Sequence, residues 1–196
     1  MKKIKHFIHS SAFVDKNVII GNNSKIWHFS HISENVKIGK DCILGQNSFI
    51  GRNVKIRNNV KIQNNVSIFE GVELKNDVFC GPSVVFTNVL KPRSFINQKK
   101  SFLKTLVNIG VTIGANSTII CGINLGKFSF IGAGSLVTKN LKPFSLNYGN
   151  PSKQVGWVNR NGSKLNIPLK GNFEKFCNET KKIYILKQNN LYEKSK

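Results

Sequence analysis

The sequence predicts an all-β chain wound into a parallel β-helix, because it carries a six-residue apolar repeat, a second series of small residues, and glycines at a fixed place in the repeat. Apolar residues six apart would drift around a helix of about 3.6 residues per turn, so the repeat is not helical. No polar residue interrupts the main series, which comprises Ile8, Val14, Ile20, Ile26, Ile32, Ile38, Leu44, Ile50, Ile56, Ile62, Ile68, Leu74, Cys80 and Phe86.

From Val14 onward, a residue that is small or β-branched stands two residues before each of these positions, such as Val36 before Ile38. Alternate side chains of a strand point to the same face, so each such pair predicts one short strand with both residues directed inward. The next four residues then turn a corner. A glycine often follows the apolar residue, as Gly39 does, and we expect it to supply the positive φ of the turn.

The repeat breaks after residue 88. Residues 89–106 fit no hexad and contain Pro92 and five basic residues. The period resumes in a new phase at Val107, Ile113, Ile119, Leu125, Ile131 and Val137. We therefore expect a loop extruded at about residues 89–106 from an otherwise continuous helix. Long loops without secondary structure are usually functional.

The chain leaves the repeat near Leu141. We predict a β-helix domain over residues 1–150 and a capping segment with a basic tail over residues 151–196. The run from Tyr148 to Val158 is expected to cross the open end and cap it, since a solenoid end exposes unpaired strand edges. Residues 172–186 are compatible with a small hairpin or a short helix.

The chain of 196 residues has a formal net charge of +21. Nucleic acid, anionic lipid, ligands with several phosphates and mere compositional drift all fit this charge. The basic residues are scattered, so we favour drift and expect no nucleic-acid partner. Cys42 and Cys80 fall on inward positions, and no Cys-x-x-Cys pair occurs, which fits a reducing cytoplasm. We expect no signal peptide and no membrane-spanning segment.

Beyond the hexads, several runs resemble the bacterial hexapeptide-repeat acyltransferases. Within them the chain looks similar to the N-acetyltransferases that modify the 3-amino group of UDP-2-acetamido-3-amino-2,3-dideoxyglucuronate. The matching runs are WHFSH (27–31), LGQNSFIG (44–51), KIQNNVSI (61–68), DVFCGPSVVFTNVLKPRS (77–94), GANSTIICG (114–122), IGAGSLVTK (131–139) and GNPSKQVGWV (149–158).

The resemblance implies a left-handed β-helix, whereas the general rule for parallel crossovers would predict a right-handed one. It also implies acetyl-CoA as the acetyl donor and a UDP-linked amino sugar as the acceptor, for surface polysaccharides such as the O-antigen of lipopolysaccharide. A homotrimer with active sites between neighbouring prisms is implied as well.

The same resemblance implies that Asn88, at the end of the FTN run, contacts the reacting sugar; a corner asparagine bonded to its own backbone is the alternative. Arg93 is a candidate for phosphate or carboxylate binding through its guanidinium, or else a solvated loop charge. The remaining candidates for the sugar nucleotide are His28, Gln63, Asn64, Asn65, Phe86 and Thr87.

For coenzyme A, the resemblance implies backbone contacts at the corners of Ala115 and Ala133. Lys139 and Lys153 could meet the coenzyme phosphates or could simply be solvated. All four histidines precede the loop, so we expect no histidine base and a reaction that depends on positioning. Related chains often carry a cluster of cysteines near the C-terminus; here Asn161 and Thr180 stand where cysteines are expected, and we predict no metal.

Three other readings stay open. The chain could acetylate another nucleotide-linked amino sugar, such as a dTDP-linked 3-amino-6-deoxyhexose. A γ-class carbonic anhydrase would need three histidines around zinc between subunits, an arrangement absent here. A structural or ice-binding solenoid would expose regular ladders of one residue type, whereas these corners vary.

Overall fold

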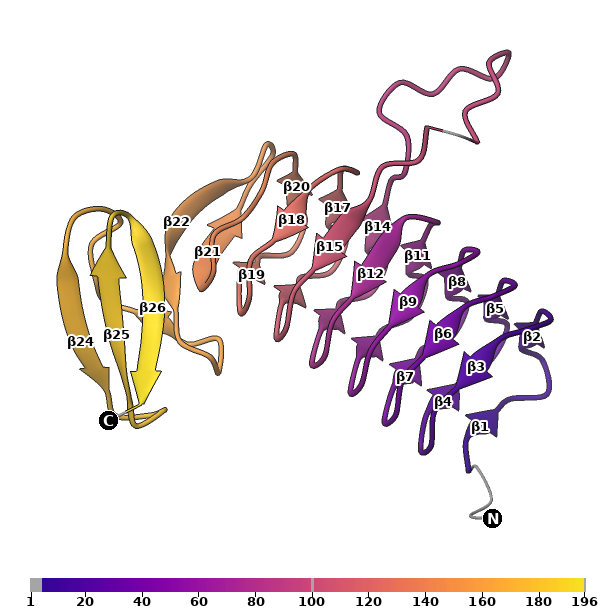
Figure 1. Ribbon diagram of the computed structural model, residues 1–196, viewed down its shortest axis with the longest axis horizontal. Helices are drawn as coiled ribbons and strands as arrows, with labels where there is room; N and C mark the ends of the chain where they lie inside the picture. Colours follow the sequence, from indigo (N-terminus) through magenta and orange to yellow (C-terminus); the bar gives the residue numbers. More distant parts are fainter. Residues whose placement is uncertain (1–4, 100, 196) are drawn as a thin grey trace.

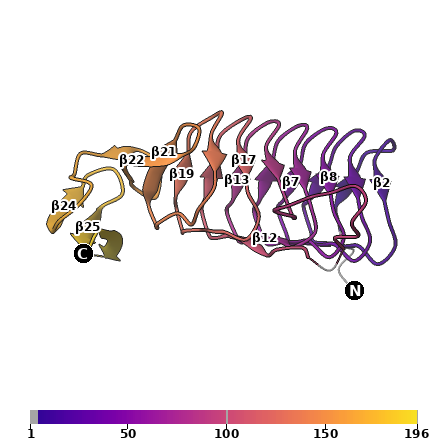
Figure 2. The same cartoon turned by 90° about the horizontal axis from the view of Figure 1, so that it is seen from above.

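The computed structural model describes residues 5–99 and 101–195, and it contains no helix within them. The chain coils into a rod with three flat sides, whose coils pair through parallel strands, as Figures 1 and 2 show. Strands stack on the strand one coil earlier, 18 residues back through most of the repeat, as in the pair Lys61 and Ile43. The predicted left-handed parallel β-helix is confirmed.

The strands follow one another around the rod in sequence order, one on each sheet. The first sheet contains β1 (Phe7–Ile8), β4 (Lys25–Ile26), β7 (Ile43–Leu44), β10 (Lys61–Ile62), β13 (Phe79–Cys80), β16 (Thr112–Ile113), β19 (Phe130–Ile131), β21 (Ser145–Tyr148), β22 (Lys153–Val158) and β23 (Lys164–Leu165). The second contains β2 (Phe13–Val14), β5 (His31–Ile32), β8 (Phe49–Ile50), β11 (Ser67–Ile68), β14 (Val85–Phe86), β17 (Thr118–Ile119) and β20 (Leu136–Val137). The third contains β3 (Ile19–Ile20), β6 (Lys37–Ile38), β9 (Lys55–Ile56), β12 (Val72–Leu74), β15 (Thr105–Val107) and β18 (Asn124–Leu125).

The core is the column of inward side chains predicted by the repeat. From Ile26 to Phe86 every residue of the main series is 3% exposed or less, and the second block from Val107 to Val137 is fully buried. Burying each aliphatic side chain stabilises the fold by about 1.5–3 kcal/mol. Because a single coil has an interior only where another coil covers it, stability depends on the length of the stack.

The corners differ from the prediction in one respect: asparagine, and not the glycine after the apolar residue, most often supplies the positive φ. The third residue after the apolar position is left-handed along most of the rod. Asparagine fills it at residues 17, 23, 35, 47, 53, 59, 65 and 116, each with φ between 55° and 62°. Asparagine tolerates this conformation because its short side chain can bond locally.

The glycines of the repeat are needed for space instead. Gly39 and Gly81 do not have positive φ. A Cβ on Gly39 would lie 2.6 Å from the backbone carbon of Arg57 in the next coil, and one on Gly81 would lie 2.6 Å from the nitrogen of Ala115. The corners of adjacent coils are therefore in contact through backbone atoms at these positions.

The predicted excursion is present as a loop over residues 87–104, between β14 and β15. It projects from the middle of the rod in Figure 1. Its neck is closed by a hydrogen bond from the nitrogen of Leu103 to the carbonyl of Asn88, 2.9 Å long. The prediction placed residues 105 and 106 in the loop, but they belong to β15, because they pair with Val72 and Glu73.

After the last coil the run from Tyr148 to Val158 folds back as β22, antiparallel to β21, and lengthens the first sheet. An antiparallel sheet of β24 (Phe173–Cys177), β25 (Lys182–Lys187) and β26 (Asn190–Ser195) follows. Of the two predicted forms for residues 172–186, the hairpin is the one observed. Trp157 and Tyr184 are fully buried in a second hydrophobic cluster separate from the rod core.

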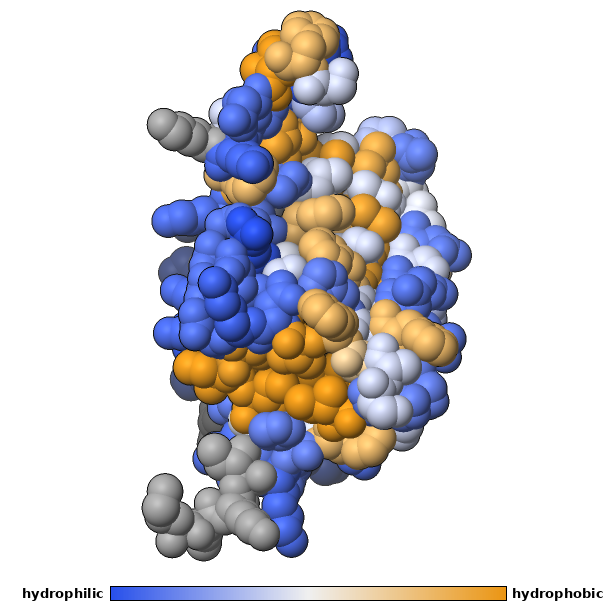
Figure 3. All heavy atoms as spheres, turned by 90° about the vertical axis from the view of Figure 1, so that its right-hand side faces the viewer, coloured by the Kyte–Doolittle hydropathy of each residue, from blue (hydrophilic) through white to orange (hydrophobic). Residues whose placement is uncertain are grey.

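The opposite end of the rod exposes the first coil. Phe7, Phe13 and Ile19 are 43%, 66% and 58% exposed, and Figure 3, which looks onto this end, shows apolar surface there. No helix long and apolar enough to cross a membrane occurs in the described part of the chain.

Candidate functional site

The edge between the first and second sheets, which we call the first edge, gathers half of the predicted site residues. It consists of the corners at residues 9–12, 27–30, 45–48, 63–66, 81–84, 114–117 and 132–135. Backbone hydrogen bonds join these corners from coil to coil; the nitrogen of Ser83 bonds the carbonyl of Asn64, and the nitrogen of Gly134 bonds that of Ala115. His28, Gln63, Asn64, Asn65, Ala115 and Ala133 thus lie along one line.

Some of the predicted polar groups on this edge are already engaged in holding the coils together. The side-chain oxygen of Asn64 accepts a 2.9 Å hydrogen bond from the nitrogen of Gln46. The oxygen of Asn65 accepts one from the amide of Asn47 at 3.0 Å. The ring of His28 packs against that of His9 at a tilt of 31°, with ring centroids 3.5 Å apart. These contacts hold adjacent coils together. Among residues 63–65, Gln63 has the side chain that makes no such bond to the preceding coil within the described residues.

The edge between the second and third sheets, the second edge, carries the other group. Thr87 and Asn88 form the start of the loop, and Arg93 lies exposed on it. The hydroxyl oxygen of Thr87 accepts a hydrogen bond from the nitrogen of Cys121, at 2.9 Å, and so fixes the neck to the next coil. Lys139 is exposed on the same edge nearer the C-terminal end.

Asn88 differs from the corner asparagines. Its backbone carbonyl closes the loop neck, but its half-buried carboxamide has no hydrogen-bond partner among residues 5–99 and 101–195. An amide held at the base of a loop and left unpaired is available to a ligand, because buried polar groups are normally hydrogen-bonded.

Two predicted residues lie elsewhere. Phe86 points inward from β14 and is fully buried in the rod core. It therefore packs the strand beneath the loop neck and has no surface to offer a sugar. Lys153 is exposed on β22 beside Tyr148, past the C-terminal end of the first edge.

The second sheet, which separates the two edges, has an uncharged outer face. Its outward residues are Phe13, His31, Phe49, Ser67, Val85, Thr118 and Leu136. Phe13, His31 and Phe49 form a row with ring centroids 5.5 Å and 5.7 Å apart. In a chain with net charge +21, a face free of lysine and arginine is a distinctive surface.

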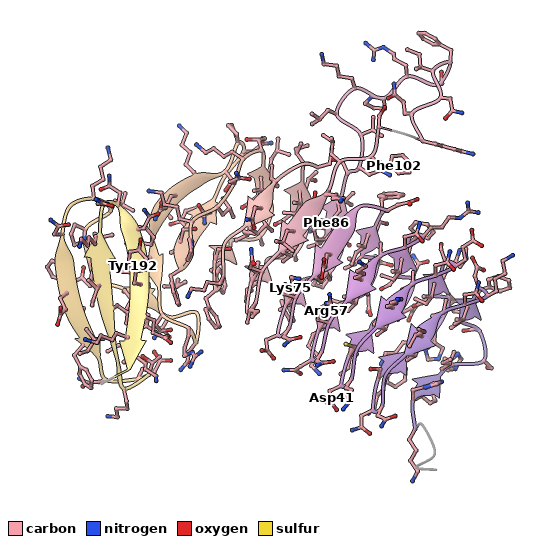
Figure 4. All side chains as sticks on the ribbon, in the orientation of Figure 1. Asp41, Arg57, Lys75, Phe86, Phe102 and Tyr192 are labelled. Carbon is pink, nitrogen blue, oxygen red and sulfur yellow. The ribbon has the colours of Figure 1, made fainter. Side chains whose placement is uncertain are left out.

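A groove that the sequence did not reveal lies on the other side of the loop. It has a volume of about 520 Å³ and is lined by Asn53, Lys55, Glu70, Glu73, Phe102 and Lys104, among others. Its floor is formed by β9, β12 and β15, and its wall is the returning arm of the loop. Figure 4 shows Phe102 at the base of the loop above these strands. This volume is within the usual range for small-ligand sites.

The charges in this region are partly paired. Glu73 accepts hydrogen bonds from Lys75 at 2.8 Å and from Arg57 at 2.9 Å. The bond from Lys75 contributes most to lowering the pKa of Glu73, against an opposing effect of burial. Glu70 accepts one hydrogen bond from the amide of Asn53 at 2.8 Å. Lys55 and Lys104 have no such partner in the described part of the chain.

The cysteines are single buried residues. Burial raises the pKa of Cys80 to about 12, so this thiol is not ionised near neutral pH. Burial opposes ionisation of Cys177 too, but hydrogen bonds to its sulfur from Thr180, Asn159 and the backbone of Glu179 outweigh it and lower its pKa. Within the described residues no group of three His, Cys, Asp or Glu side chains could hold a metal.

Comparison with known proteins agrees with the architecture. The family model of the bacterial transferase hexapeptide matches residues 17–52, and that of the hexapeptide repeat of succinyl-transferase matches residues 35–70 and 109–139. A solved structure from Bacillus cereus, provisionally named an acetyltransferase, has 24% identity and a TM-score of 0.55 over 81% of each chain. That similarity shows the fold.

Curated relatives also match parts of the chain, among them the following two. The dTDP-3-amino-3,6-dideoxy-alpha-D-galactopyranose 3-N-acetyltransferase of Aneurinibacillus thermoaerophilus is 44% identical over 66 residues, 34% of either chain. The bifunctional protein GlmU of Thermotoga maritima is 33% identical over 84 residues, 42% of this chain and 18% of that one. The matches thus span about a third or less of the length of these relatives.

Proposed function

We propose that the chain is a hexapeptide-repeat acyltransferase, as its matches to the two hexapeptide family models support, and that it transfers an acetyl group from acetyl-CoA to the amine of a nucleotide-linked amino sugar. The observation that carries the proposal is the neck of the 87–104 loop, where a regular solenoid is interrupted and an unpaired Asn88 carboxamide is held in place. The 44% identity to an N-acetyltransferase acting on a dTDP-linked amino sugar supports the acceptor class.

We propose that the active site forms between copies of the chain in a homotrimer. Asn88 and Gln63 lie on different edges of one rod, with the second sheet between them, so one copy does not bring them together. A heterologous contact through the uncharged second-sheet face would set the second edge of one rod beside the first edge of the next, and three such contacts can close a ring.

The loop itself supports this assembly. Leu90, Phe95 and Ile96 are 58%, 83% and 47% exposed. Exposed apolar side chains of this size on a projecting loop indicate a protein contact. In the proposed trimer they would pack on the neighbouring rod, and Asn88 and Arg93 would face the neighbour's Gln63.

The proposed reaction is the transfer of an acetyl group from a thioester to an amine. The neutral amine nitrogen attacks the thioester carbonyl carbon, the carbon–sulfur bond breaks, and the thiolate of coenzyme A leaves and takes the proton that the nitrogen releases. The Asn88 carboxamide would accept a hydrogen bond from the amine and so orient its lone pair. Holding two reactants in this geometry can supply about 7–11 kcal/mol of the barrier reduction.

Coenzyme A would lie along the later coils of the first edge. The corners at Ala115 and Ala133 have small side chains that let an extended ligand approach the backbone. Lys153 of the same copy, and Lys139 on the second edge of the neighbouring copy, would meet its phosphates. In finer detail we propose the 3-amino group of UDP-2-acetamido-3-amino-2,3-dideoxyglucuronate as the acceptor, in a cytoplasmic step of surface polysaccharide synthesis. Residues 1–150 would form the catalytic domain and residues 151–196 an appendage, although β21 and β22, which meet at this boundary, are hydrogen-bonded neighbours.

A dTDP-linked 3-amino-6-deoxyhexose is the second candidate, favoured by the same 44% match. The two are separated by measuring thiol release from acetyl-CoA with a panel of UDP- and dTDP-linked amino sugars. Turnover restricted to the uronate would support the finer proposal, and turnover restricted to the deoxyhexose would replace it. Absence of turnover with every 3-amino acceptor would refute the acetyltransferase itself.

A further inference from the structure

From the groove beneath the loop we propose a binding site for a nucleoside diphosphate, with the base on Phe102 and the diphosphate between Lys55 and Lys104. The inference rests on the proposed function only in its choice of ligand class, because both proposed substrates carry a nucleoside diphosphate. None of the residues expected from the sequence to bind substrate or coenzyme lines this groove.

The groove is built by a close backbone approach. In the coil beneath the loop, the left-handed corner position is Gly71 in place of asparagine, with φ of 99°. A Cβ at Gly71 would lie 2.8 Å from the carbonyl oxygen of Leu103, on the returning arm of the loop. The nitrogen of Thr105 also bonds the carbonyl of Gly71, at 2.9 Å. The arm is thereby fixed against the second edge, with Phe102 and Lys104 on either side of Leu103.

The charge of the lining favours an anion despite its two carboxylates. Glu73 is held by both Arg57 and Lys75, within 2.9 Å of each, so little of its charge is left uncompensated. Lys55 and Lys104 are exposed and unpaired within residues 5–99 and 101–195. With Arg57 and Lys75 bonded to Glu73 from outside the lining, the two unpaired lysines are opposed within the groove chiefly by Glu70.

The remaining lining is suited to the flat part of the ligand. Phe102 is half-buried at the wall, and Leu106 and Val72 lie on the floor. Aromatic side chains stack on nucleobases without regard to sequence, since every base has a π-face. The unpaired amide oxygen of Asn53, whose nitrogen is bonded to Glu70, can accept a hydrogen bond from a base edge or a ribose hydroxyl.

Two sources could supply this chemistry: the nucleotide of the acceptor sugar and the adenosine diphosphate end of coenzyme A. Isothermal titration of the full-length protein with UDP, dTDP and adenosine 3′,5′-bisphosphate distinguishes them. The test variants are Phe102→Ala and the double variant Lys55→Ala with Lys104→Ala. Lys37→Ala is the matched control, because Lys37 pairs with Lys55 one coil earlier on the same sheet but lies outside the groove.

We expect affinity for one nucleotide type to fall at least about tenfold in both test variants, because Phe102→Ala loses the stacked base and the double variant loses both phosphate contacts. Lys37→Ala should bind as the wild type does, and Phe102→Tyr should retain affinity. If the variants lose affinity for UDP or dTDP, the groove binds the acceptor. If they lose affinity for adenosine 3′,5′-bisphosphate, it binds the coenzyme. Circular dichroism melts confirm that each variant is folded.

Unchanged binding of all three nucleotides in folded Phe102→Ala and double-lysine variants would overturn the proposal, and so would a loss of the same size in Lys37→Ala. The thiol-release assay is read separately. If the groove variants turn over substrate and match the wild type in nucleotide affinity and in KM, the groove is not a nucleotide site, and the proposed function stands. Nucleotide binding that depends on the groove without any acetyl transfer supports the groove and refutes the proposed function.

Discussion

The two kinds of glycine in this rod make a sharp prediction about stability. Gly81 follows an apolar position and lies where two coils touch, and an added Cβ would be 2.6 Å from the nitrogen of Ala115 and 2.9 Å from the carbon of Gly114. Gly134 occupies a left-handed corner with φ of 69° and has nothing within 4 Å of its added Cβ. We predict that Gly81→Ala is the more destabilising substitution.

The magnitudes follow from the two mechanisms. At Gly81 the opposing atoms are backbone, so the coils must separate locally, and overpacking of this kind costs typically 1–3 kcal/mol. We expect a value near the upper limit, about 3 kcal/mol, because neither backbone segment can rotate away. At Gly134 an alanine meets only the dihedral penalty of the left-handed region, about 1–2 kcal/mol.

The assay is urea unfolding followed by far-ultraviolet circular dichroism and by tryptophan fluorescence, at equal protein concentration for all variants. The midpoint of Gly81→Ala should lie below that of Gly134→Ala, and both below that of the wild type. Equal midpoints, or a lower midpoint for Gly134→Ala, would refute the argument that close coil contact fixes the glycines of the repeat.

Three further predictions concern catalysis, assembly and pH. Asn88→Ala should lower turnover at least about tenfold without changing the proposed trimer, while Asn97→Ala on the same loop should be active; thiol release and light scattering measure both. Phe49→Asp should dissociate the proposed trimer in sedimentation velocity, whereas Ile19→Asp on the third sheet should not. The depressed pKa of Glu73 stabilises the protein above its unfolded value, about 4.3, and that contribution is lost as the pH falls through its folded value. The stability advantage over Glu73→Gln, under about 1 kcal/mol for a pair this exposed, should thus shrink progressively in denaturation experiments as the pH is lowered below about 4.3.

Much of the fold could be read from the sequence because the repeat is local. Each hexad determines one strand and one corner, and a residue's inward or outward direction follows from its place in the hexad. The break in the period predicted the loop at residues 89–106, within two residues of its observed ends at 87 and 104. The handedness came from the resemblance to a family, since the spacing of the apolar residues is the same in either hand.

The sequence did not predict which corner residue, asparagine or glycine, adopts the positive φ. Both recur at fixed places in the hexad, and both are turn formers. Only the coordinates show that Asn59 and its equivalents adopt positive φ and that Gly39 is needed where adjacent coils touch. The distinction depends on a distance between coils, which is not a property of one hexad.

The candidate site shows the same division. Motif context selected Asn88, whose free carboxamide fits the interpretation, but it also selected Phe86, which is buried in the core. The order of the hexads could have placed Gln63 and Asn88 on different edges, since one complete face separates them. Nothing periodic indicates the groove, whose wall comes from the aperiodic loop.

The order of amino acids is enough to predict a rod of short parallel strands, its apolar interior, the place where it is interrupted and the chemical class of enzyme that it resembles. The coordinates were needed to show which polar groups are already occupied between coils and that Phe102 and Lys104 return beside Gly71. The reason is that equivalent residues of a repeat make the same contacts in every coil. The path of a segment without a repeat depends on contacts with residues far away in sequence.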